Sequence, residues 1–173
     1  MCGGILNVLK ELDVKKVIIG EQGEKSQQYI EFYEIIKEKQ IKVVVVRQGD
    51  VINIEQNVKI CVLFPENELI ENNILNNNSL VFKIEYKAFQ MLFTGDIEQV
   101  AEERILNKYK NTGVLKATIL KVAHHGSKTS SITDFINAVN PKIALIGVGE
   151  NNKFGHPNED ILERLIDVRN ENL

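Results

Sequence analysis

The chain has 173 residues, of which 43% are apolar and 26% charged, with 3 prolines and no Trp. This composition is typical of a soluble globular protein and argues against a disordered one. The net charge of −3 argues against a domain that holds nucleic acid by charge alone, because such domains present a basic face. No apolar run approaches the roughly 20 residues of a membrane-spanning helix. We therefore expect one soluble domain over residues 1–173.

The first part of the chain alternates between helix and strand patterns. We expect a helix over about 5–12, a strand at 16–20, an amphipathic helix at 26–40 and a strand at 42–46. Strands separated by helices indicate an α/β fold.

Four strand patterns follow with no helix-length segment between them, at 51–54, 58–64, 80–86 and 89–94. The segment ENELIENNILNNN (66–78) is polar and predicts a loop. The short connection between the last two strands indicates antiparallel pairing.

Helices alternate with strands again after Asp96. We expect a helix over about 98–109, a strand at 117–122, a helix opened by Ser131, a strand at 142–148 and a last helix from about Asn158. Ser131 and Asp134 have the S-x-x-D spacing of a capping box. Pro157 stands just before the last helix, where proline is favoured.

Four polar segments fall at strand ends: NNNSL (76–80), TGD (94–96), HHGS (124–127) and GVGENNKFGHP (147–157). They contain all three histidines of the chain. Active sites of α/β proteins are commonly built from loops at one edge of a sheet. These segments are therefore the candidate site.

Each candidate also has a structural interpretation. Asp96 alone is most simply a helix N-cap, and His156 before Pro157 a turn residue. Neighbours along an extended segment point to opposite faces, so at most one of His124 and His125 would enter a given site. Ser127 lacks the G-x-S-x-G turn of a serine nucleophile and is by default a loop residue.

The functional interpretation is a metal site. Carboxylate and imidazole groups bind Zn²⁺ or Mn²⁺, and a metal-bound water is a nucleophile near neutral pH. Asp96 and His156 would supply two ligands. Catalytic zinc uses at least three protein ligands, so these two alone make a poor site.

Three segments together resemble the C-terminal metallo-β-lactamase-like domain of the ComEC family of DNA-uptake competence proteins: NNNSLVFKIEYKAFQMLFTGDIEQVAEERIL, LKATILKVAHHGSKTSS and NPKIALIGVGENNKFGHPNEDILERL. The resemblance runs from about 76 to 165. It implies an αββα sandwich with Zn or Mn at one edge and a phosphodiesterase or nuclease activity. DNA as partner and attachment to a membrane-spanning portion in bacteria are further implications of the family.

The same resemblance assigns roles to single residues. Asp96 looks like the carboxylate that bridges two metal ions, and His156 like a late metal ligand. The catalytic positions, which would contact the metal-bound water or the substrate phosphate, are His124, His125 and Ser127. The substrate-binding positions are Asn76, Asn77, Ser79 and Lys128.

The chain departs from the family at its first residues. Members of the fold carry H-x-H-x-D-H followed by a glycine pair, whereas this chain opens with Met1, Cys2, Gly3 and Gly4. Gly3 and Gly4 look like that pair, so the motif that supplies most metal ligands is missing. We expect a fold incomplete at the N-terminus, no efficient hydrolysis by this chain alone, and metal binding that could be lost altogether.

An incomplete sheet also leaves an open edge, which favours a homo-oligomer, most simply a dimer. Two other functions stay open. One is a non-catalytic remnant that oligomerises or binds a partner, and the other is a general hydrolase of small esters with the same fold.

Overall fold

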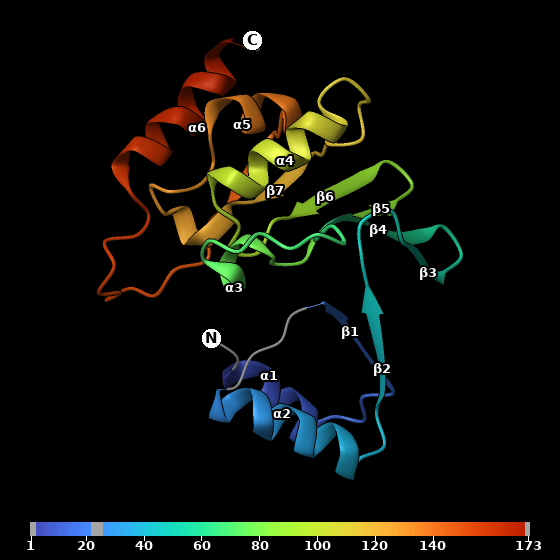
Figure 1. Ribbon diagram of the computed structural model, residues 1–173. Coiled ribbons are helices and arrows are strands. Elements are labelled where there is room, and N and C mark those ends of the chain that lie inside the picture. The colour runs from blue at the N-terminus through green and yellow to red at the C-terminus, as the bar shows by residue number, and fades with distance from the viewer. Residues whose placement is uncertain (1–2, 22–25, 172–173) are drawn as a thin grey trace. The chain divides into compact units, whose positions relative to one another are not determined.

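The structure is a computed structural model that describes residues 3–21 and 26–171 (Figure 1). The chain divides into two compact units, Met1–Val46 and Arg47–Leu173. Each unit has its own apolar core. The assignment of the whole chain to a single domain stays a prediction. Among the described residues, no helix has the length and apolarity needed to cross a membrane.

The first unit combines two helices with a two-stranded parallel sheet. Its elements are α1 (Gly3–Glu11), β1 (Lys16–Gly20), α2 (Gln27–Glu38) and β2 (Lys42–Val46). Ser26 caps α2, because its hydroxyl accepts a hydrogen bond from the Tyr29 backbone N–H at 3.3 Å. The core residues recur at helical spacing and are Leu6, Leu9, Phe32, Ile35 and Ile36, joined by Ile41. The four elements expected here are confirmed: both strands have the expected bounds, and the helix ends are shifted by one or two residues.

The second unit is built on a six-stranded sheet in the order β3-β4-β5-β6-β7-β8. The strands are β3 (Val51–Glu55), β4 (Val58–Phe64), β5 (Val81–Tyr86), β6 (Phe89–Phe93), β7 (Ile119–Lys121) and β8 (Ile143–Leu145). The first four pair antiparallel, as predicted from their succession without a helix-length segment and from the short connection between the last two. From β6 to β8 the pairing is parallel. The last two strands are shorter than expected.

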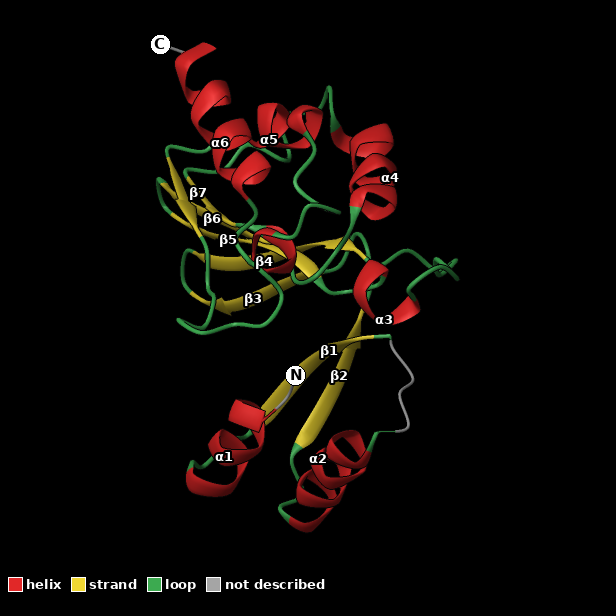
Figure 2. Cartoon of the chain, turned by 90° about the vertical axis from the view of Figure 1, so that its left-hand side faces the viewer, coloured by secondary structure: helices red, strands yellow, loops and turns green. Residues whose placement is uncertain are grey.

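Three helices cover one face of this sheet: α4 (Gln99–Tyr109), α5 (Thr133–Val139) and α6 (Glu159–Glu171) (Figures 1 and 2). Their apolar residues meet alternate residues of the strands, so Ile105, Phe135 and Ile161 share a core with Leu92 and Leu120. Burial of such side chains contributes roughly 1.5–3 kcal/mol each. The helical layer thereby fixes the sheet edge at which the polar loops begin.

The segment 66–78 is not only a loop, because it contains the one-turn helix α3 (Ile74–Asn77). The fully buried Asn78 side chain holds this segment in its folded shape. Its side-chain NH₂ donates to the carbonyls of Ile70 and Ile74 at 2.8 and 2.7 Å, and its carbonyl accepts from the Ile70 N–H at 2.9 Å. The Asn run is thus a folded segment held by one amide, which a composition-based interpretation cannot detect.

The predicted capping box of Ser131 and Asp134 is wrong. Helix α5 has Ile132 at its N-cap, with no side-chain cap bond, and Asp134 pairs with Lys110 at 2.9 Å. The N–H groups of Ser131 and Ile132 donate instead to the two carboxyl oxygens of Glu102, at 2.6 and 2.9 Å. A carboxyl group from the neighbouring helix α4 therefore replaces the local cap.

Burial sets the chemistry of Glu102, which has no exposed surface. Burial raises the pKa of its carboxyl group from 4.5 to about 7, against the two backbone hydrogen bonds and Arg164, which lower it. The folded protein therefore keeps a proton on Glu102 at pH values where the unfolded chain releases it.

We expect the free energy of unfolding to fall as pH rises from about 4.5 to about 7, and this group to add no slope above that range. The folded state binds the proton more tightly, so releasing it costs stability, about 3 kcal/mol over the whole interval. Denaturant unfolding at several pH values measures the slope. Glu102→Gln should remove it, while the exposed Glu163→Gln on α6 should keep it. An unchanged slope in the Glu102 variant would contradict the assignment.

Candidate active site

The candidate site lies where β6 and β7 end. These strands are parallel neighbours with Phe93 opposite Lys121, so the loops that follow them start at the same sheet edge. Two hydrogen bonds tie the loops together. The Thr94 hydroxyl donates to the Lys121 carbonyl at 2.6 Å, and the His124 N–H donates to the Gly95 carbonyl at 3.0 Å.

Asp96 follows this junction and is not the cap of α4. The helix begins at Gln99 and Glu98 is its N-cap residue, so the simplest structural interpretation of Asp96 is wrong. Its backbone N–H donates to the Ser79 hydroxyl at 3.1 Å, and one carboxyl oxygen lies 3.6 Å from His125 Nε2. The carboxylate therefore remains available to the site.

His125 is oriented at both ring nitrogens. Its Nδ1 lies 2.5 Å from the Gly147 carbonyl, which can only accept, so Nδ1 carries the proton. Nε2 then faces Asp96. Because Gly147 follows β8 and Asp96 follows β6, this ring joins the ends of two strands.

The expectation that only one of the adjacent histidines enters the site is wrong. Residues Ala123–Gly126 form a short helical turn in which His124 and His125 both have left-handed backbone angles, with φ of 47° and 57°. The alternation of side chains applies only to extended backbone. In this turn both rings face the same group of loops.

His124 contacts three residues of the site. The Asn76 side-chain amide lies 3.4 Å from Nε2. Its ring packs edge-on to the His156 ring at a centroid distance of 5.9 Å. The buried Nδ1 has no hydrogen-bond partner among the described residues, and Glu98 Oε1 lies 3.7 Å away. The three histidines of the chain thus converge through His124.

Glu98 is a site residue that the sequence interpretation missed. Its carboxyl oxygens accept from the Asn77 side-chain amide at 3.2 Å and from the Thr129 hydroxyl at 3.0 Å. Its backbone N–H donates to the Asn77 side-chain carbonyl at 3.1 Å. The signal is its position two residues after Asp96, which by local pattern alone indicates only the start of a helix.

The other predicted positions lie around this group with different accessibility. Asn77 is buried, and its side-chain amide donates a hydrogen bond to Glu98, so it holds that carboxyl group in position. Ser127 is also buried, and its hydroxyl pairs with the Thr129 hydroxyl at 3.1 Å. Lys128 is exposed. The catalytic role of Ser127 and the substrate-binding roles of Asn76, Asn77, Ser79 and Lys128 stay predictions.

Burial and neighbouring charges tune two side chains. Burial lowers the pKa of the His156 imidazole, and His124 and His125 lower it further. Burial also lowers the pKa of the Lys121 ammonium, while the Asp96 carboxylate opposes that shift. The edge therefore combines the acidic side chains of Asp96 and Glu98 with a neutral His156 imidazole and a partly desolvated lysine.

The donor set does not fit a complete metal centre. No group of three or more His, Cys, Asp or Glu side chains that could hold a metal ion occurs in the described part of the chain. Asp96 approaches His125, whose Nδ1 is taken by a carbonyl, and His156 packs against His124. The predicted pair Asp96 and His156 falls short of the three ligands of a catalytic zinc site. Met1 and Cys2 lie outside the described residues.

The chain is similar in sequence and in fold to known proteins. No protein-family model matches the chain. ComE operon protein 3 of Bacillus subtilis is 33% identical over 158 residues, which are 91% of this chain and 20% of that protein. Competence protein ComA of Neisseria gonorrhoeae is 37% identical over 90 residues, or 52% of this chain and 13% of that one. The chain thus spans about a fifth or less of the length of these relatives.

A solved structure from Parabacteroides distasonis, named "Putative metal-dependent hydrolase", superposes with a TM-score of 0.51 at 14% identity, covering 90% of this chain and 74% of that one. That likeness shows the fold alone, a mixed α/β fold that this chain shares with that structure. The sequence identities carry the relationship itself. The chain is therefore homologous to one region of competence proteins that include ComE operon protein 3 and ComA.

Proposed function

We propose that this chain is the substrate-facing part of a metal-dependent phosphodiesterase or nuclease region that acts in DNA uptake, and that alone it lacks efficient hydrolase activity. One observation carries the proposal. Asp96 and all three histidines gather at one sheet edge, where the loops after β6 and β7 are tied together. The relation to competence proteins supplies the link to DNA uptake and to a membrane-attached protein.

The geometry supports phosphate as the group to be bound. An ammonium is a hydrogen-bond donor for phosphate oxygens, and Lys121, which donates one N–H to the Val122 carbonyl and lies near Asp96, provides it at this edge. A hydrolase of small neutral esters would have less use for a cation here. The metal-ligating side chains of the described residues, in contrast, are too few for a metal centre. We therefore propose that this chain binds the substrate and that metal binding needs ligands beyond these residues.

We expect the purified chain to retain fewer than one tightly held ion after incubation with Zn²⁺ or Mn²⁺ and desalting, because it lacks three convergent ligands. Elemental analysis gives the stoichiometry, and a fluorescent DNA strand reports cleavage. Retention of one ion or more by the chain as it stands would overturn this expectation.

A chain extended at its N-terminus by a segment with the H-x-H-x-D-H motif should bind metal and cleave phosphodiesters. In that extended chain, Asp96→Ala should lower the cleavage rate by about 100-fold or more, since the variant removes a metal ligand or its near neighbour. Asp134→Ala is the matched control, because that exposed carboxylate pairs with Lys110 outside the site. Equal rates for the two variants would exclude the role of Asp96.

We also propose that the chain forms a homodimer through β8. This strand is the last in the sheet order, and Ile143 and Leu145 on one of its faces are 49% and 43% exposed. An exposed apolar edge strand offers N–H and C=O groups and side chains for pairing with another strand. This observation favours the second candidate function, a partner-binding protein without turnover, and is compatible with the first.

Light scattering after size exclusion should give about twice the mass of 19.6 kDa for the wild-type chain. Leu145→Glu should give the monomer, because a charge at the edge must be desolvated on pairing. Ile166→Glu on α6, at an exposed position outside the sheet, should leave the mass unchanged. A wild-type monomer at every concentration would rule out the dimer.

A further inference from the structure

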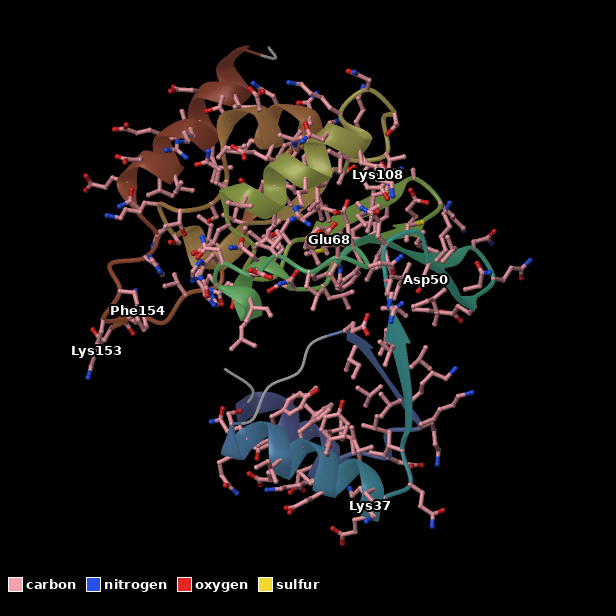
Figure 3. All side chains as sticks on the ribbon, viewed as in Figure 1. Lys37, Asp50, Glu68, Lys108, Lys153 and Phe154 are labelled. Atoms are coloured by element: carbon pink, nitrogen blue, oxygen red, sulfur yellow. The ribbon has the colours of Figure 1, made fainter. Side chains whose placement is uncertain are left out.

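Phe154 is the most exposed large apolar side chain of the described residues. It is 74% exposed, whereas the next most exposed, Leu12 and Ile166, are 58% exposed. The residue lies with Lys153 at the outer turn of the loop between β8 and α6 (Figure 3). A single exposed apolar residue is ordinary on a protein surface. Its position and its support set this one apart.

The turn that carries Phe154 is built by one amide side chain. The side-chain carbonyl of Asn152 accepts hydrogen bonds from the backbone N–H groups of Phe154 and His156 at 3.2 and 3.0 Å. Its NH₂ group donates to the His156 carbonyl at 2.7 Å. Asn152 thus fixes the backbone of Phe154 relative to the backbone of His156.

The two rings are arranged accordingly. The Phe154 and His156 rings lie nearly parallel, 19° apart, with a centroid distance of 5.9 Å. His156 in turn packs against His124. An aromatic ring open to solvent therefore begins a row of rings that leads into the candidate site.

The surroundings of Phe154 favour a planar ligand over a protein partner. Its chain neighbours, residues 149–153 and 155, are Gly, Glu, Asn, Asn, Lys and Gly, and the next exposed large apolar residue of the loop is Val148, six positions away. A protein interface needs a contiguous apolar core. A nucleobase needs only one ring face, and stacking on an aromatic side chain contributes about 1–3 kcal/mol per base. Lys153 is an exposed cation beside it.

We propose that Phe154 is a stacking platform for an unpaired base of a single-stranded nucleic acid, with Lys153 near the strand's phosphate. In a duplex both faces of each base are covered, so the site selects single strands. The net charge of −3 is consistent with this mode, because a strand held partly through its bases needs fewer cations than one held by phosphates alone. This inference rests on the proposed function and names its substrate class.

The absence of Trp from the chain makes a direct test available. Phe154→Trp creates a single tryptophan, and a base stacked on it should quench its emission. Titration with oligodeoxythymidylate of about ten nucleotides, at low salt and with EDTA, should give saturable quenching. An abasic strand of the same length should leave the emission unchanged, because it carries phosphates without bases.

Ile166→Trp is the matched control, since it places a single tryptophan at another exposed position of the same unit. Its emission should not respond. For the protein without tryptophan, anisotropy of a labelled oligodeoxythymidylate should show affinity about tenfold lower in Phe154→Ala than in wild type. Lys153→Ala should weaken binding to the abasic and the complete strand alike.

Any of these binding results would overturn the proposal: equal quenching by the abasic strand, an equal response from Ile166→Trp, unchanged affinity in Phe154→Ala, or no binding by the wild-type chain. A change of mass in Phe154→Ala by light scattering would also overturn it, because the ring would then contact a second copy. With EDTA present no hydrolysis is measured. Failure of the oligonucleotide-binding test therefore does not affect the Asp96 cleavage test of the proposed function, and failure of the cleavage test does not affect the binding test.

Discussion

The candidate site depends on the carboxyl groups of Glu98 and Glu102 at the start of α4. Glu98 at the N-cap of α4 and Glu102 one turn later both hold the loop that follows β7. Glu98 accepts from the Thr129 hydroxyl, and Glu102 accepts from the N–H groups of Ser131 and Ile132. Because Ile105 packs α4 into the core, the position of α4 also fixes the position of the loop.

This arrangement explains how a strained turn persists. Left-handed backbone at His124 and His125 is uncommon for non-glycine residues and costs of order 1–3 kcal/mol each. The cost is met by fixing both ends of the loop. The His124 N–H donates to Gly95 at one end, and Glu102 holds the other. Strain of this kind is common at functional sites, where it directs side chains that regular structure would separate.

Close backbone approach requires glycine at two points of the same region. A Cβ atom on Gly95 would lie 2.6 Å from the Ser79 Cβ, and one on Gly126 would lie 2.8 Å from the Pro157 Cβ. Both positions also have positive φ, where other residues are strained. The glycines of the TGD and HHGS motifs therefore bring four chain segments together. These motifs follow from packing as much as from chemistry.

Local patterns predicted most of the fold. Periodicity predicted the helices and strands of both units, because this signal lies within a few residues, and the short connection between β5 and β6 predicted their antiparallel pairing. The motifs also identified Asp96 and the three histidines as neighbours at a strand end. Their order along parallel strands was enough for that.

What failed depends on contacts between distant residues. The capping box matched a local rule, but Glu102, 29 residues before Ser131, supplies the acceptor. Glu98 looked like an ordinary helix start because its partners, Asn77 and Thr129, lie 21 and 31 residues away. The orientation of His124 and His125 depends on backbone angles that no side-chain pattern encodes. Sequence patterns thus locate the site, while its internal geometry is set by tertiary hydrogen bonds.

The same distinction separates the two chemical tasks of the region. Metal binding needs several ligands at one point, and the described residues of this chain do not supply three. In the proposed function, substrate binding uses the row of rings from His124 through His156 to Phe154, and the metal ligands that the described residues do not supply come from elsewhere. The proposal thus assigns substrate recognition and metal binding to different sets of residues.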